Sequence, residues 1–394
     1  MQSVVKSKTG YRKTVRQVLA AASLLLLPAV LPTLASAQTP DYSSYSTARL
    51  QNLAQSGDAE AIFTLGVTLI FDENGIRPDA DFAKAKALLT EADNRGHDAA
   101  SSILTLYYDG EFGGEPDPVK LEAMLSRAAV RGSGEAKLNY GMRFLGSEDT
   151  AKSNKAMRYL KQATADETVR DAAYPALIEV LYGAEGEKFE NSVAARRTAR
   201  ECINVTPGNA ICHFILAQDL ENGWGGPVNK SASLKHYLEG AKLGEMQSQW
   251  ALGMKYLNGD GVAKNERTAF ELVKKSADQD YHDGLLTFAA MNALGQGTPE
   301  NKRAAFETYE RAASFGSGPA MRGLGAMYCV GDAPKTDKDL CAAALILAYD
   351  MEDDPAADLL GEFFQVEDQA SYDALKSRTS ASRTELMRRY NLEF

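Results

Sequence analysis

Residues 248–262, SQWALGMKYLNGDGV, decide the fold. The stretch has a small residue at Ser248, a large apolar residue at Leu252 and an aromatic residue at Tyr256. Residues four apart share one face of an α-helix, so these three form a single stripe. Gly259 then supplies the left-handed residue on which helices commonly end. The stretch therefore predicts a helix with one small, close-packing position and two large ones.

The same pattern recurs along the chain at intervals of 36 to 39 residues. The positions equivalent to Leu252 are Leu65, Ile103, Tyr140, Leu177, Leu216, Phe288, Leu324 and Leu360. A second apolar-periodic segment follows each helix, as in residues 231–244 and 303–313. Each period is a helix hairpin too small to bury its own apolar face, so it must stack on its neighbours. The chain is predicted to be an all-α, right-handed solenoid of about nine such hairpins.

The pattern is clearest in residues 248–262, 304–316 and 320–331, where it resembles the Sel1-like repeat, a relative of the tetratricopeptide repeat. The resemblance covers residues 58–394, with the units around Leu177 and Leu360 the weakest. We expect residues 38–57 to form an N-terminal capping segment, residues 58–368 the repeat solenoid and residues 369–394 a C-terminal capping helix. The resemblance implies a long concave surface that binds peptides or protein segments.

The tail carries a cluster of basic residues: Lys376, Arg378, Arg383, Arg388 and Arg389. A solvated outer face of the capping helix and a docking patch are the two interpretations of this cluster.

The first 37 residues have the features of a secretory signal peptide. Five basic side chains precede an apolar run through Leu24–Leu27, and Ala35-Ser36-Ala37 is a small-x-small cleavage site. We expect cleavage before Gln38 and a periplasmic protein. The alternative is an uncleaved membrane anchor, but prolines interrupt a stretch shorter than the roughly 20 apolar residues a spanning helix needs. No later segment is apolar enough to span a bilayer, so no stable membrane insertion is expected after cleavage.

The chain is acidic, with a formal charge of −10 that falls to −15 when residues 1–37 and their five basic side chains are removed. Such a surface repels nucleic acid and bare anionic membrane. The partners expected from charge are other envelope proteins, or neutral or cation-bridged polymers.

Four cysteines, Cys202, Cys212, Cys329 and Cys341, follow the signal segment, and export would bring them to an oxidising compartment. Two local disulfides are expected, Cys202 with Cys212 and Cys329 with Cys341, each across a contact between neighbouring helices.

No constellation typical of a catalytic, metal or cofactor site occurs. His97, His213, His236 and His282 fall at dissimilar repeat positions and never at metal-ligand spacing along one helix. We therefore expect no enzymatic activity, no cofactor and no metal.

The residues expected to contact a partner are aromatic: Trp224, Trp250 and Tyr256. For Trp224, in the turn after residue 223, the alternative is a ring folded back on its own hairpin.

Three functions are compatible with a secreted Sel1-like protein. The first is a periplasmic scaffold, similar to those of alginate-type exopolysaccharide export complexes, although the acylated cysteine of those proteins is lacking here. The second is a periplasmic regulator of a membrane sensor kinase. The third is a penicillin-binding or β-lactamase-like enzyme of the cysteine-rich Sel1 type, which the presence of only two cysteine pairs disfavours.

Overall fold

The computed structural model describes residue 42 and residues 45–392, apart from 73–74, 78, 111, 113–114, 145–146, 148, 184–188 and 336. The predicted signal peptide (1–37) and residues 38–41 and 43–44 of the predicted capping segment lie outside the described residues. The chain divides into two compact units, with the boundary between Pro207 and Gly208.

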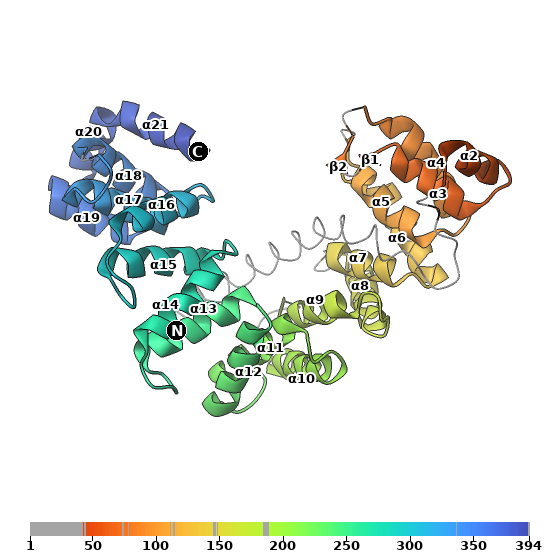
Figure 1. The fold of residues 1–394 in the computed structure, drawn as a ribbon, viewed down its shortest axis with the longest axis horizontal. Coiled ribbons are helices and arrows are strands. Elements are labelled where there is room, and N and C mark those ends of the chain that lie inside the picture. The colour runs from red at the N-terminus through yellow and green to blue at the C-terminus, as the bar shows by residue number, and fades with distance from the viewer. Residues whose placement is uncertain are drawn as a thin grey trace. The chain divides into compact units, whose positions relative to one another are not determined.

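The first unit is a succession of helices that pack on their neighbours in chain order (Figure 1). Its helices are α2 (Thr47–Gln55), α3 (Ala59–Thr68), α4 (Phe82–Asn94), α5 (Asp98–Tyr108), α6 (Pro118–Arg131), α7 (Gly134–Phe144), α8 (Thr150–Ala163), α9 (Arg170–Gly183) and α10 (Phe189–Val205). Between α3 and α4, strands β1 (Phe71–Asp72) and β2 (Gly75–Ile76) pair antiparallel, with Phe71 opposite Ile76. Helix α2 precedes the first hairpin, and its buried Leu50 packs against Ala61 and Leu65 of α3.

The second unit continues the same alternation (Figure 1). Its helices are α11 (Ala210–Asn222), α12 (Lys230–Lys242), α13 (Met246–Asn258), α14 (Glu266–Ala277), α15 (His282–Leu294), α16 (Lys302–Ala313), α17 (Gly318–Val330), α18 (Lys338–Asp350), α19 (Pro355–Phe364), α20 (Gln369–Arg378) and α21 (Ser380–Arg389). One apolar core runs through the later part of this unit, from Ala277 and Leu285 to Leu386 and Tyr390.

The repeat register of the sequence agrees with the helices. Each of the nine reference positions lies in an odd-numbered helix, from Leu65 in α3 to Leu360 in α19, and each even-numbered helix from α4 to α18 forms the second arm of a hairpin. Helix α13 ends at Gly259, whose φ of +75° is the left-handed conformation expected there and whose N–H donates to the carbonyl of Lys255. The prediction of an all-α solenoid of stacked hairpins is confirmed.

The C-terminal segment differs from the expected single capping helix. It consists of α20 and α21, separated at Thr379, where the backbone leaves helical geometry (φ −96°, ψ 13°). This break allows α21 to pack on α18, and the hydroxyl of Tyr390 then reaches a carboxylate oxygen of Glu310 at 2.9 Å. Contacts with α18 and with Glu310 of α16 thus hold the tail in place, and the helical pattern of the tail does not encode them.

Among the described helices, none combines the length and the apolarity needed to cross a lipid bilayer.

Candidate functional site

An open groove of about 290 Å³ lies in the second unit. Its lining comes from two first helices and the segments beside them: Phe214, Gln218, Glu221 and Asn222 of α11; Trp250, Ala251, Met254, Lys255 and Asn258 of α13; and Tyr237, Asp260 and Tyr281. A groove between helices with an apolar wall and a few convergent polar groups is a common form of ligand site.

The repeat itself builds this groove. Phe214, Gln218 and Asn222 lie four residues apart along α11, and Trp250, Met254 and Asn258 occupy the equivalent places 36 residues later in α13. Four-residue spacing puts each trio on one helical face. Stacking one hairpin on the next brings the two faces together as one surface.

A charged cluster closes one side of the groove. The ammonium of Lys255 donates to Glu221 and, at 3.3 Å, to Asp260, while its side chain is only 12% exposed. The hydroxyl of Tyr237 donates to the other oxygen of Glu221 at 2.8 Å. Burial and the neighbouring carboxylate of Glu221 raise the pKa of Tyr237 above its usual range. This side therefore carries two carboxylates, one ammonium and a phenol that remains protonated.

Another part of the lining is aromatic. The indole N–H of Trp250 donates to the hydroxyl of Thr287 at 3.0 Å, and the rings of Trp250 and Tyr281 pack in a T-shaped arrangement with centroids 5.9 Å apart. Tyr281 in turn donates to Asp283 at 2.9 Å. These contacts hold the half-buried indole in place, so one part of the ring stays available to the groove.

Two amide side chains in the lining have hydrogen-bonding capacity to spare. Gln218 and Asn258 make no side-chain hydrogen bond to the residues that the structure describes. Asn222 donates to the backbone carbonyl of Gln218 at 3.0 Å. Free amides beside an aromatic wall can pair with the polar groups of a bound chain.

The three aromatic residues predicted to contact a partner lie in different surroundings. Trp250 lines the groove. Tyr256 packs against the buried cluster of Ala269, Val273 and Met291, and Trp224 is half-buried in the turn between α11 and α12; neither lines the groove. The sequence interpretation missed Glu221, Lys255 and the amides, although Asn222 and Asn258 could have been found by comparing positions 36 residues apart.

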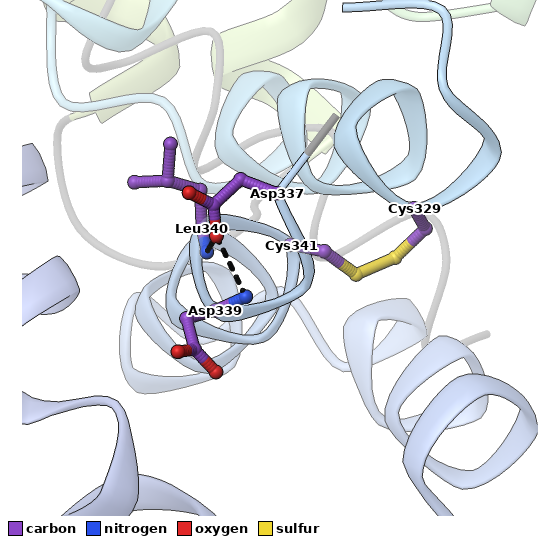
Figure 2. The surroundings of a disulfide bond; sticks show 5 residues. All are labelled: Cys329, Asp337, Asp339, Leu340 and Cys341. Atoms are coloured by element: carbon purple, nitrogen blue, oxygen red, sulfur yellow. Dashed lines mark hydrogen bonds between the residues drawn. A yellow bond between two sulfur atoms is a disulfide. The ribbon is translucent and has the colours of Figure 1, made fainter. Parts of the chain in front are cut away.

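The cysteines occur at helix contacts. Figure 2 shows the disulfide that joins Cys329 of α17 to Cys341 of α18, close to Asp337. Asp337 caps α18 by accepting from the backbone N–H groups of Asp339 and Leu340 at 3.0 and 3.1 Å. Cys202 and Cys212 are both buried, and no cysteine of the described chain is free.

The basic cluster of the tail is largely engaged within the chain. Lys376 and Arg383 lie 2.9 and 3.7 Å from Asp350, and Arg389 pairs with Glu310. Arg378 lies 3.8 Å from Asp339. Four of the five basic side chains of the tail therefore pair with carboxylates of this chain.

Two histidines that the sequence placed at dissimilar repeat positions come together, with His213 Nδ1 3.1 Å from His236 Nδ1. Over the described residues, no three His, Cys, Asp or Glu side chains gather closely enough to hold a metal ion.

Comparisons with known proteins agree with the repeat register. The Sel1 repeat pattern matches residues 134–166, 210–245, 247–281, 289–316 and 318–348. The groove is thus built from two consecutive matched repeats, 210–245 and 247–281.

Among solved structures, the chain is similar to a Sel1 repeat protein from Oxalobacter formigenes, with a TM-score of 0.60, 20% identity, and coverage of 84% of this chain and 92% of that one. A protective antigen of uropathogenic Escherichia coli with an SLR fold aligns with a TM-score of 0.31 and 16% identity, over 88% of this chain and 95% of that one. A putative Sel1 repeat protein from Klebsiella pneumoniae aligns with a TM-score of 0.23 and 15% identity, over 63% of this chain and 99% of that one. The curated proteins yield no significant match.

Proposed function

Because this chain is a Sel1 repeat protein, we propose that it is a periplasmic interaction scaffold that holds an envelope partner in the groove between α11 and α13. Sel1 repeat proteins are generally scaffolds for protein–protein interaction. The observation that carries the proposal is the groove itself, whose lining combines the half-buried Trp250 with the free amides of Gln218 and Asn258.

The chemistry of the groove suits binding. When a partner side chain covers the aromatic surface of Trp250 and the thioether of Met254, the burial of this apolar surface favours binding. The amides pair with main-chain groups, which every peptide offers regardless of sequence. Rigid helices carry these groups, so little conformational entropy is lost when a partner docks.

The periplasmic location rests on the basic and apolar pattern of residues 1–37 and the small residues before Gln38. The test is cell fractionation followed by mass spectrometry of the intact protein. A periplasmic chain that begins at Gln38 supports the proposal, and a cytoplasmic chain that retains Met1 contradicts it.

We propose an exopolysaccharide export complex as the assembly that this scaffold serves, on the strength of the resemblance to alginate-type scaffolds. The acidic surface favours contact with proteins of that complex over contact with an anionic polymer.

Affinity purification from envelope extracts tests the scaffold role. Wild-type protein should recover a polysaccharide synthase, a polymer-modifying enzyme or an outer-membrane pore. Met254→Glu places a charge on the apolar wall and should abolish recovery, whereas Leu243→Glu, at an exposed site at the end of α12, should not. Recovery of a sensor kinase alone would favour the regulator instead. Equal recovery by both variants would exclude the groove as the binding site.

A further inference from the structure

The face that lines the groove continues along the first helices of the next two repeats, and its chemistry changes on the way. Asn222, Asn258, Leu294 and Val330 are the last residues of α11, α13, α15 and α17, each 36 residues from the one before. The two asparagines line the groove, while Leu294 and Val330 are 67% and 60% exposed. Along these four equivalent positions, amide side chains are therefore replaced by aliphatic ones.

The residues one helical turn earlier in these four helices change in the same way. Gln218 and Met254, which line the groove, are succeeded at the equivalent positions by Ala290 and Ala326, both half-buried. The α15 and α17 end of the face thus consists mainly of aliphatic surface. Two cations near this end are paired, Arg322 with the buried Asp353 at 2.7 Å and Lys302 with Asp332 at 2.6 Å.

The α11 and α13 end is acidic. Glu221 and Asp260 share the single ammonium of Lys255, and Asp283 lies behind Tyr281. The exposed Lys230 also lies 4.0 Å from Asp260, so this end has three carboxylates against two ammonium groups. A cationic group entering the groove would meet an excess of carboxylate there.

We propose that this face, as the partner site of the scaffold proposed above, selects a peptide segment with Lys or Arg at one end and aliphatic side chains at the other. The basic end lies at Glu221 and Asp260, and the aliphatic end lies across Leu294 and Val330. Helices in direct contact are about 10 Å apart, and the first helices of successive repeats are at least that far apart. An extended chain advances about 3.3 Å per residue, so a peptide needs roughly nine residues or more to cross all four.

A peptide fits this face better than a saccharide. Leu294 and Val330 offer no hydrogen-bonding side-chain group, so sugar hydroxyls placed on them would lose their contacts with water without replacement. Aliphatic side chains of a peptide would instead gain from the same burial.

The test is selection from a display library of random 12-residue peptides on the immobilised full-length protein, followed by fluorescence anisotropy with the most enriched peptide. Enriched sequences should be basic in one half and aliphatic in the other. Binding should weaken as salt rises, because the basic end is held by charge.

Paired variants assign the two ends. Glu221→Gln with Asp260→Asn should weaken binding about tenfold and reduce its salt dependence. Leu294→Ser with Val330→Ser should weaken binding by a similar factor of about ten and leave the salt dependence unchanged. Glu239→Gln and Leu243→Ser, at exposed sites at the end of α12 and just after it, are the matched controls and should bind like wild type.

Enrichment of acidic or uncharged peptides would overturn the inference, as would unchanged binding by both groove pairs. Binding of a glucan oligosaccharide with no peptide enriched would also overturn it. The scaffold proposal is tested separately, by affinity purification of an envelope partner with wild-type protein and loss of that partner with Met254→Glu.

Discussion

Gly253 of α13 lies directly against Val273 of α14, so that a Cβ added to the glycine would be 2.8 Å from Val273 Cγ2 and 3.2 Å from the carbonyl oxygen of Ala269. The two helices of this hairpin approach so closely because position 253 has no side chain. Gly325 holds the same register position two repeats later, where an added Cβ would be 2.8 Å from Leu345.

Gly253→Ala should lower the free energy of unfolding by about 1 to 3 kcal/mol, because the new methyl group overpacks the contact with Val273. Gly253→Leu should be more severe and should uncouple the repeats on either side. Gly361→Ala is the matched control, since the nearest atom lies 3.7 Å away and alanine is the better helix former. Urea unfolding measures both, and equal effects at the two glycines would contradict the packing argument.

Tyr390→Phe should release the end of α21. The hydroxyl of Tyr390 donates to Glu310 from 80 residues away, and the ring is buried. A hydrogen bond to a charged group contributes about 1.5 to 3 kcal/mol, so limited proteolysis should cut α21 sooner in the variant. Combining it with Glu310→Gln should add less than the sum of the single effects. Full additivity would show that the two residues do not interact.

Asp93→Ala should destabilise the first unit by about 2 to 3 kcal/mol. Its buried carboxylate accepts from Arg131 at 2.6 Å, Arg127 at 3.2 Å and Ser101 at 2.7 Å, and thereby ties α4 to α5 and α6. Glu271→Ala, at an exposed ion pair of α14, should change stability by less than about 0.5 kcal/mol. Thermal unfolding of the two variants compares a buried carboxylate with an exposed one. A similar loss of stability in both variants would refute the larger contribution assigned to the buried carboxylate.

Stability should fall at alkaline pH. Burial and the hydrogen bond to Glu122 raise the pKa of Tyr140 to about 12, whereas an unfolded tyrosine titrates near pH 10. The folded state therefore favours the protonated phenol, so this contribution is complete below about pH 10 and is lost as the pH rises towards 12. Urea unfolding between pH 9 and 11 should show a smaller decline for Tyr140→Phe than for wild type. Identical declines in the two proteins would show that Tyr140 does not contribute to the loss of stability at alkaline pH.

Breaking the Cys329–Cys341 bond should lower stability by about 3 kcal/mol, because the bond closes a short loop of sequence separation 12 in the unfolded chain. Cys329→Ala, Cys341→Ala and the double variant should lose the same amount, since each removes the same cross-link. A loss confined to Cys341→Ala would point to packing of that buried side chain instead.

The sequence by itself determined the helices and their register. The stripe of residues 248, 252 and 256 and the glycine at 259 are local signals, and their recurrence at 36 residues requires hairpins that stack on one another. All nine reference positions consequently fall in first helices. Tertiary structure decided which side chains of neighbouring repeats meet. Glu221 and Lys255 pair across 34 residues, and Tyr390 and Glu310 across 80. No periodicity within one repeat encodes such contacts, because they depend on how one hairpin is rotated and packed on the next. For the same reason the groove, and the division of the tail into α20 and α21, emerged only from the packed chain.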